Sequence, residues 1–467
     1  MAWAEPVPLP ARLREELRQA VQEDFARTVE ELGSLVRIPA MAWDAFDPAE
    51  LHRAAASVAD LVREAGIDDV EILQAPRPDG RAGAPAVVGR RPAAPGRKTL
   101  FLYAHYDVQP AGDLALWQSP PFEAVARDGR LWGRGVADNK AGVLLHVAAL
   151  RAVLRVLGDS LGLGVTVFID GEEEAGSPSL PLLLQERPDL IRSDVLVVAD
   201  SGNWKVGVPA LTTSLRGLIA GTIEVQVLDH ALHSGTYGGP LLDAVTVLSR
   251  LIATFHHDDG SVAVRGLPAS EVPGPELDEA SFRADAGVRP GTALAGTGSI
   301  ASRLWTKPAL TVTGMDVPTV ALSSDTLQPV ARAKVSISLA PSTDTAAAME
   351  ALRSHVEAHT PFGAEVRFYP GGRTEGFAGD TSSAAAGLML SAMTDTWGVP
   401  AVCMGVGGSI PVVDMLNKLS PRAEILITGA EDPDSRAHGA NESIDLEDFQ
   451  KAVLAEALLI AGLDIPE

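Results

Sequence analysis

The chain has 467 residues, more than the roughly 250–300 at which one hydrophobic core stops growing, so we expect two domains. Its net charge of −23 disfavours binding to nucleic acid or to an anionic membrane. The single cysteine, Cys403, excludes an intrachain disulfide and a thiolate metal cluster, and it fits a cytoplasmic protein. No secretory signal pattern and no membrane-spanning apolar run is evident, so we expect neither secretion nor a membrane partner.

The first half of the chain alternates between predicted helices and strands. Apolar residues recur at spacings of three and four from Leu13 to Val36, which predicts a helix ending before Pro39. A second helix is predicted at 142–157. Apolar, β-rich runs predict strands at 98–105, 165–170 and 194–200. This alternation indicates an α/β domain with a mainly parallel sheet flanked by helices.

The pattern changes after Asn203, where residues 212–229 are predicted to form extended strands. A helix at 240–255, loops at 256–297, a strand at 331–341 and a helix at 345–359 indicate an inserted α+β domain. A strand at 423–430 and a helix at 446–463 then return to the first domain. We therefore predict a catalytic domain at 1–210 and 379–467, with the insert at 211–378.

Polar, ligand-type residues follow the predicted strands. His105 and Asp107 come at the end of the first strand, where open α/β sheets place their ligand groups. A histidine ligand commonly gives its other ring nitrogen to a carboxylate, so Asp107 is a candidate to orient His105. A surface or core pair is the alternative reading of these two residues. Asp200 ends the third strand, and His438 lies in the loop after the fourth, where a solvated histidine is the alternative.

Two further acidic sites complete the pattern. Asp138 lies in the glycine-rich loop LWGRGVADNKAG, where it is a candidate to bridge two cations or, alternatively, to cap the following helix. Glu172, Glu173 and Glu174 follow the second strand directly. Clustered carboxylates repel one another unless cations neutralise them, although a solvated charge run at a helix start is the alternative. Imidazoles mixed with carboxylates suit Zn²⁺ or Mn²⁺.

Eight motifs then stand in the order found in one enzyme family: HYDVQP, LWGRGVADNKAG, DGEEEAGS, VADSGNW, SLRG, DHALHSGTYGG, VGGSIP and RAHGANES. In these motifs, and over nearly its whole length, the chain resembles the carnosinase-like dipeptidases. Those enzymes belong to the zinc metallopeptidase family that also includes aminoacylase and carboxypeptidase G. The resemblance implies an α/β catalytic domain, an inserted lid and dimerisation domain, a homodimer, and two Zn²⁺ per subunit, with Mn²⁺ or Co²⁺ as alternatives.

The resemblance also implies roles for individual residues. Asp107 orients a ligand and Glu173 is the general base, whereas Glu172 is left as a spare acid. The implied metal ligands are His105, Asp138, Glu174, Asp200 and His438, with Asp138 bridging. His233 is implied to reach into the active site of a second subunit. The implied substrate contacts are Arg216, Gly408 and Ser409.

The implied reaction is hydrolysis of an amide bond, in a dipeptide or a small C-terminal amino-acid conjugate, by a hydroxide that bridges the two metals. One departure concerns the substrate. Ser338 stands where such dipeptidases commonly have an arginine for the substrate's carboxylate, and a hydroxyl does not replace a guanidinium. Arg332 and Arg216 are the alternative cations. An N-acyl amino acid, or another small amide, is therefore the alternative substrate.

Two other classes fit the sequence less well. A non-catalytic protein that keeps the fold is disfavoured because all five candidate ligands and the base are present. A serine hydrolase is disfavoured because the segment GGSIP, at 407–411, lacks the second glycine of a Gly-x-Ser-x-Gly nucleophile elbow.

Overall fold

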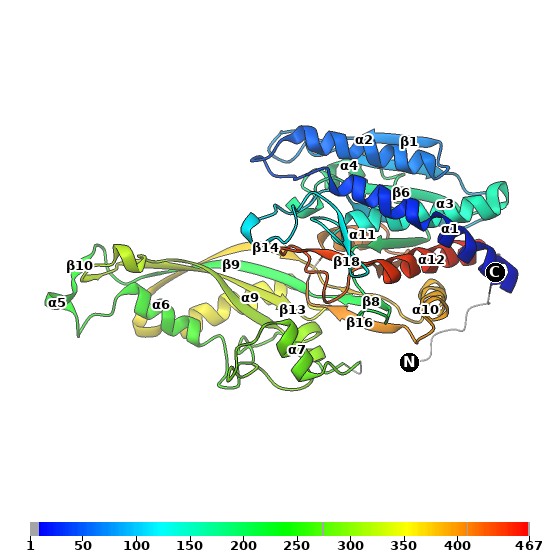
Figure 1. The fold of residues 1–467 in the computed structure, drawn as a ribbon. Helices are drawn as coiled ribbons and strands as arrows, with labels where there is room; N and C mark the ends of the chain where they lie inside the picture. Colours follow the sequence, from blue (N-terminus) through cyan, green and yellow to red (C-terminus); the bar gives the residue numbers. More distant parts are fainter. Residues whose placement is uncertain (1–8, 273–274, 409, 466–467) are drawn as a thin grey trace. The chain divides into compact units, whose positions relative to one another are not determined.

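The computed structural model describes residues 9–272, 275–408 and 410–465. The chain divides into two units, whose backbone is drawn in Figure 1. Unit 1 comprises Met1–Thr213, Gly379–Met404 and Pro411–Glu467, and unit 2 comprises Ser214–Ala378 and Gly405–Ile410. Each unit has a hydrophobic core of its own. That the insert works as a lid and dimerisation domain stays a prediction.

A nine-stranded sheet is built around four parallel neighbours, in the order β6-β3-β7-β17. Their interior positions are buried Val, Leu, Ile and Phe, as expected for strands covered on both faces. The prediction of a mainly parallel sheet is confirmed, although the outer strands pair antiparallel. The strands are β1 (Asp69–Leu73), β2 (Ala86–Arg91), β3 (Thr99–His105), β6 (Gly164–Asp170), β7 (Val195–Ala199), β8 (Ala210–Leu215), β15 (Phe377–Ala378), β16 (Val402–Val406) and β17 (Glu424–Thr428).

Helices flank this sheet, as predicted. The central one, α3, packs against α1 and α12, and α12 also packs against α10. Figure 1 shows α1, α3 and α12 side by side in unit 1. The helices of unit 1 are α1 (Ala11–Val36), α2 (Pro48–Glu64), α3 (Lys140–Leu157), α4 (Leu180–Glu186), α10 (Ala384–Trp397), α11 (Pro411–Leu419) and α12 (Leu446–Leu463).

A small antiparallel sheet adds a feature that the sequence did not reveal. Its strands are β4 (Val125–Arg127), β5 (Arg130–Trp132) and β18 (Ser443–Asp445), with β5 in the middle. Ser443 pairs with Trp132 and Asp445 with Arg130, although these residues are about 300 positions apart in the sequence. The loop after β5 and the loop before β18 are therefore held next to each other.

Unit 2 is an antiparallel sheet, in the order β11-β13-β9-β14, packed against helices α6 and α9. Buried and less buried residues alternate along β13, so one face of the sheet is covered by the helices. Its main elements are β9 (Gly217–Gln226), β11 (Ala309–Asp316), β13 (Val330–Leu339), β14 (Glu365–Thr374), α6 (Ala244–Ala253), α8 (Ile300–Trp305) and α9 (Thr345–His359). Shorter elements are β10 (Leu232–His233), β12 (Thr326–Leu327) and α5 (Ser234–Tyr237).

The prediction of loops throughout 256–297 is wrong at one place. A short helix, α7 (Glu279–Asp285), forms there because the side chain of Asp278 accepts the backbone N–H of Ser281 and caps it.

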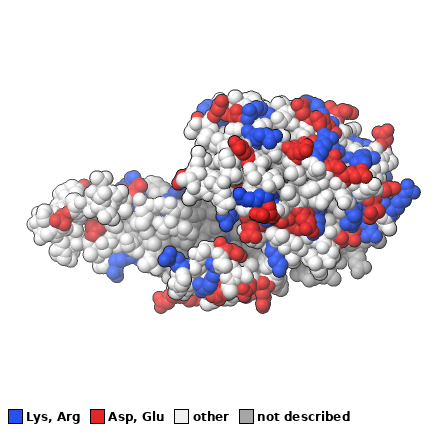
Figure 2. All heavy atoms as spheres, in the orientation of Figure 1, with Lys and Arg blue, Asp and Glu red and all other residues white. Residues whose placement is uncertain are grey.

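The surface charges and the hydropathy of the helices bear on the expectations from composition. On the face of unit 1 seen in Figure 2, acidic and basic side chains are interspersed, as on a solubilising surface. Among the described residues, one helical segment, Lys140–Ser160, is long and apolar enough to cross a membrane, with a mean hydropathy of 1.7. Since 67% of it is buried inside the protein, it has the character of a core helix.

Candidate metal centre

The ends of three of the four parallel strands, β3, β6 and β7, gather one group of candidate residues. His105 is the last residue of β3, and Asp200 follows β7 directly. Glu173 and Glu174 form a short 3-10 turn three residues after β6. Because the carboxyl ends of parallel strands meet at one edge of a sheet, these side chains converge there.

The remaining two candidates reach the same edge through the small sheet. Asp138 lies in the loop after β5, and His438 lies in the loop that leads to β18. The antiparallel pairing of β5 with β18 brings the two loops together. With Asp107, which lies 3.2 Å from His105, all seven residues predicted for the centre in the first domain are brought together in unit 1.

One half of the centre surrounds His105, whose side chain is buried. Its Nε2 lies 3.2 Å from Oδ1 of Asp138, 3.4 Å from Oδ1 of Asp200 and 4.0 Å from Oε2 of Glu173. The other ring nitrogen, Nδ1, lies 3.1 Å from the backbone oxygen of Asp107 and 3.2 Å from its Oδ1. Asp107 therefore orients the ring through Nδ1, while Nε2 faces the carboxylates of the other residues.

The other half surrounds His438. Its Nε2 lies 2.9 Å from Oδ2 of Asp138 and 3.2 Å from Oε2 of Glu174. The second oxygen of Glu174, Oε1, is buried without a hydrogen-bond partner among the described residues. Asp138 thus turns one carboxylate oxygen to each histidine, and it is shared by both halves.

Asp107 also organises the turn that carries the two glutamates. Its Oδ1 accepts the backbone N–H of Glu173 and its Oδ2 that of Glu174, both at 3.1 Å. The same buried carboxylate therefore sets the orientation of His105 and the position of the turn. A surface location for His105 and Asp107, the alternative reading, is wrong because both are buried.

The electrostatics show a surplus of negative charge. Burial raises the pKa of Glu173 well above its ordinary value, and Asp200 and Asp107 add to this while His105 opposes it. Burial lowers the pKa of His105, but the carboxylates of Asp200, Asp107 and Asp138 outweigh that effect and bring it well above its ordinary value. The carboxylates are thus short of positive charge.

At His438 the hydrogen bonds that the ring donates to Asp138 and Glu174 raise the pKa to about 10, against the opposing effect of burial. Burial would raise the pKa of Asp138, but its bonds to His105 and His438 hold it well below the usual range. His438 is more than half exposed, as the alternative reading expected, but it is no bystander because its ring is bonded to two carboxylates.

The donor set fits two divalent cations. His105, Glu173 and Asp200 offer ligand atoms that all lie within 4.8 Å of one another, and so do Asp138, Glu174 and His438. Neighbouring ligand atoms of a tetrahedral zinc ion lie about 3.3 Å apart, because each bond is about 2.0 Å. The separations of 2.9–3.4 Å from the histidines to Asp138, Asp200 and Glu174 match this, whereas Glu173 lies 4.0 Å from His105. Oε1 of Glu174 is a spare buried acceptor.

Two alternative readings of the acids are wrong. The residue that caps α3 is Asn139, whose side chain accepts the N–H of Gly142, so Asp138 is free of that role. The three glutamates are not a solvated run, because Glu172 is fully buried and the other two are largely so. Glu172 is also no spare acid. It receives an ion pair from Arg77 and hydrogen bonds from Ala84 and Ser179.

Several contributors escaped the sequence analysis. Asn139 donates from Nδ2 to Oδ1 of Asp200 at 2.9 Å, and Gln109 donates from Nε2 to Oε2 of Glu174 at 2.8 Å. Gln109 lies within the motif HYDVQP and could have been suspected from it. Burial raises the pKa of Glu431 well above its ordinary value, and the charges of Asp138 and Asp200 add to the effect. A further carboxyl group therefore interacts electrostatically with this centre.

His233, Arg216 and Gly408 lie in unit 2. His233 is exposed and caps α5, with its Nδ1 accepting the N–H of Gly235 at 3.0 Å. Arg216 is buried, and its terminal nitrogens donate to the backbone oxygens of Leu304 and Lys307. Gly408 is exposed, and Ser409 lies outside the described residues. The roles of these four residues stay predictions.

The structure shows the position of Ser338, the residue that stands where such dipeptidases commonly have an arginine. Ser338 lies on β13 opposite Leu218 of β9, on the less buried face of the sheet. Of the two alternative cations, Arg332 is paired with Glu224 at 2.6 Å, and Arg216 is used by the carbonyls already described. In this conformation both are already engaged by other groups.

A deep sheet-edge site with two groups of mixed nitrogen and oxygen ligands defines a metallohydrolase-type centre. Comparison with known proteins makes this specific. Residues 101–461 match the model of peptidase family M20/M25/M40. The chain belongs to this family, and the prediction that it is a metallopeptidase is confirmed.

Individual relatives are similar over different lengths. The cysteinylglycine-S-conjugate dipeptidase of Corynebacterium striatum is 34% identical over 414 residues, which cover 88% of this chain and 90% of that protein. The human Beta-Ala-His dipeptidase is 31% identical over 291 residues, 60% of this chain and 57% of that protein. The crystal structure of human carnosine dipeptidase 1 superposes with a TM-score of 0.79 at 24% identity, over 98% of this chain and all of that one. This likeness confirms the predicted fold.

Proposed function

We propose that the chain is a dipeptidase that depends on two divalent cations and hydrolyses the amide bond of a small dipeptide. The observation that carries the proposal is the sharing of Asp138 between the two histidine-containing groups, with Glu173 buried beside them. Mixed imidazole and carboxylate ligands favour Zn²⁺, with Mn²⁺ or Co²⁺ as alternatives. His105 and Asp200 would hold one ion, Glu174 and His438 the other, and Asp138 both.

The cations would supply Lewis acidity toward the scissile carbonyl and lower the pKa of water toward neutrality. The chain's own residues supply the rest. Glu173, which is close to His105 and free of a capping role, would take the proton of the attacking water and deliver one to the leaving amine. Asp107 holds the turn of Glu173 in place through its backbone N–H.

Unit 2 would complete the site. We propose that His233 stabilises the negative charge that develops on the former carbonyl oxygen, from a second copy of the chain in a homodimer. Its Nδ1 accepts a hydrogen bond, so the proton of the neutral ring is on Nε2, which is the nitrogen able to donate. Dilution that separates the subunits should abolish activity. Full activity of monomers would reject this role.

The relatives named above include a dipeptidase that acts on cysteinylglycine S-conjugates. Since the chain spans 90% of that protein, we propose dipeptides of the cysteinylglycine type as the substrate class. The alternative is an N-acyl amino acid. It is favoured by Ser338, because neither Arg332 nor Arg216 is free to replace the missing guanidinium in this conformation.

One panel of substrates tests both candidate substrate classes. Purified protein loaded with Zn²⁺ or Mn²⁺ is offered cysteinylglycine, its S-substituted forms, β-alanylhistidine and a set of N-acyl amino acids. Cleavage of dipeptides supports the first candidate. Cleavage of N-acyl amino acids alone would show that Ser338 marks a change of substrate class, and no cleavage of any amide would contradict the proposed function.

A further inference from the structure

One buried ion pair lies directly behind the candidate metal centre. Arg134 and Glu442 are 1% and 0% exposed, and Nη1 of Arg134 lies 2.8 Å from Oε2 of Glu442. Arg134 follows β5 and Glu442 precedes β18, so the pair links the two loops that the small sheet brings together. These loops carry Asp138 and His438.

Glu442 is committed to the loop of Asp138. Its Oε1 accepts the backbone N–H groups of Ala137 at 2.9 Å and of Asp138 itself at 3.0 Å. Its Oε2 accepts the N–H of Gly135 at 2.9 Å in addition to the Arg134 guanidinium. Four donors saturate a carboxylate, and charged acceptors make the stronger hydrogen bonds. The backbone around Asp138 is thereby fixed at three N–H groups.

Arg134 is committed to the loop of His438. Its Nη2 donates to the backbone oxygens of His438 at 3.1 Å and Gly439 at 3.0 Å, and its guanidinium stacks over the ring of Trp117. His438 has a φ of 62°, a left-handed conformation that is costly for a residue other than glycine. Bonds to its own carbonyl oxygen and to the next one hold it in that conformation.

We infer that Arg134 and Glu442 are positioning residues, which set the separation and orientation of the Asp138 carboxylate and the His438 imidazole so that both cations are held. A buried ion pair is weak evidence of stabilisation in general, because apolar replacements are often neutral or better. Here the pair instead makes five directed bonds to the backbone of two ligand loops. The inference rests on the proposed two-cation site.

The test measures cation affinity, which a merely structural role would not change. The dissociation constant for Zn²⁺ is measured by competition with a chromophoric chelator, on protein first freed of metal. Glu442→Gln puts an amide NH₂ against N–H donors, and Arg134→Lys loses the planar fork that reaches both loops. We expect each to weaken Zn²⁺ binding about 10–100-fold.

Arg151→Lys is the matched control. Arg151 is also a largely buried arginine of unit 1, paired with Asp24 at 2.6 Å and Glu31 at 3.0 Å, so among the described residues its side chain bonds to α1 and not to a ligand loop. Its Zn²⁺ affinity should stay within about twofold of the wild type. Far-UV circular dichroism and the Tm of the metal-free proteins check that each variant folds. If Glu442→Gln does not fold, the Zn²⁺ affinity of Arg134→Lys alone tests the positioning role.

The outcomes separate this inference from the proposed function. If the wild type binds two Zn²⁺ and the folded Glu442→Gln and Arg134→Lys variants bind them with unchanged affinity, the positioning role is overturned while the metal centre stands. If the wild type binds no Zn²⁺, both are overturned. Weaker binding in both variants with an unchanged Arg151→Lys control supports the inference.

Discussion

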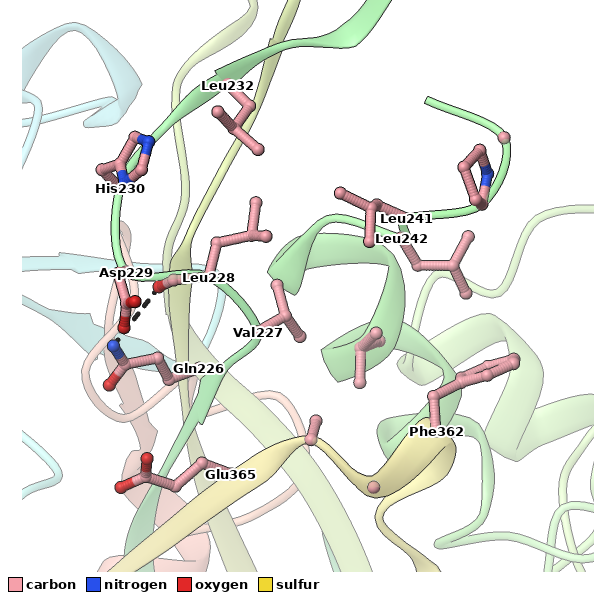
Figure 3. A pocket seen from close by; sticks show the side chains of 15 residues that line it. Gln226, Val227, Leu228, Asp229, His230, Leu232, Leu241, Leu242, Phe362 and Glu365 are labelled. Carbon is pink, nitrogen blue, oxygen red and sulfur yellow. Dashed lines mark hydrogen bonds between the residues drawn. The ribbon is translucent and has the colours of Figure 1, made fainter. Parts of the chain in front are cut away.

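Two regions of this protein are candidate ligand sites, a pocket in unit 2 and the candidate metal centre in unit 1, and they differ in kind. In unit 2, a pocket of about 810 Å³ is bounded by the segments Gln226–Leu232, Gly239–Leu242 and Phe362–Glu365. Figure 3 shows Gln226, Asp229 and His230 along one side of it, and Val227, Leu242 and Phe362 around the rest. In unit 1, the centre around Asp138 gathers buried carboxylates, the buried imidazole of His105 and the half-exposed imidazole of His438, and the pKa values of these groups are displaced by burial and by one another.

A cavity and a cluster of titratable side chains are therefore separate indications of a ligand site. The pocket of unit 2 has room for a ligand, yet among the described residues the two groups of side chains that could hold a metal ion both lie in unit 1. The centre of unit 1 is recognised by charge that lacks a counterpart and by a buried acceptor without a partner, at Oε1 of Glu174. Perturbed titratable groups that converge at strand ends are the stronger indication of catalysis.

The largest expected effect concerns the cations of the unit 1 centre. Exhaustive dialysis against a chelator should remove essentially all amidase activity, because the carboxylates and imidazoles alone provide no Lewis acid. Adding back Zn²⁺, Mn²⁺ or Co²⁺ should restore it, as followed by release of the free amino acid. Full activity in chelated, metal-free protein would contradict the proposed dependence of the unit 1 centre on cations.

Next comes the general base. Glu173→Gln keeps the size of the side chain but removes its ability to accept a proton. We expect kcat to fall by at least about 10² with two cations still bound, because proton transfer contributes about 10²–10⁴ to such rates. Metal analysis of the same sample is the control. An unchanged kcat would assign the base to another residue.

A matched pair of histidines compares the two regions directly. His233→Ala should lower kcat by about 10²-fold if this ring stabilises the developing negative charge. His230→Ala, a change in the wall of the unit 2 pocket, should leave kcat within about twofold. Equal losses in both variants would mean that the pocket itself contributes to the reaction. Steady-state kinetics on one dipeptide suffices.

A smaller effect is expected from Asn139. Its Nδ2 holds Asp200 at 2.9 Å, so Asn139→Ala should loosen one cation ligand and lower cation affinity by about tenfold. The variant also removes the cap of α3 and should lower Tm. Asp243→Ala, which removes the cap of α6 in unit 2, is the control for the capping effect, because it should lower Tm without changing cation affinity.

The smallest effect is a pH dependence of stability in unit 2. Burial, with a contribution from His359, lowers the pKa of His355 to about 4. Between about pH 6.5 and pH 4 the unfolded chain therefore binds a proton that the folded chain does not, so stability falls as pH falls through that window. His355→Gln should flatten the decline of Tm by a few degrees at most. An identical pH profile in both proteins would contradict this.

The sequence predicted what depends on local pattern. Buried parallel strands appear as apolar runs, so the strands that end at His105, Asp170 and Asp200 could be found, and ligand-type residues after each one pointed to a common edge. The motif order then placed Asp138 and His438 in the same set. Helix α12 was predicted with its observed bounds because its apolar pattern is uninterrupted.

What could not be predicted depends on distant partners. The pairing of β5 with β18 joins two three-residue strands far apart in the sequence, and such short strands have no pattern to detect. Glu172 was predicted to be a spare acid because its donors, Arg77, Ala84 and Ser179, lie in other segments. Arg134 and Glu442 act largely through backbone groups, which carry no sequence signal.

We propose that one carboxylate, Asp138, serves two cations at the sheet edge of unit 1. The most direct test counts the Zn²⁺ ions bound per chain, by elemental analysis after equilibrium dialysis, in the wild type and in Asp138→Asn. We predict two ions in the wild type and fewer than one in the folded variant, because both sites lose a shared ligand. Two ions in both proteins would contradict the claim.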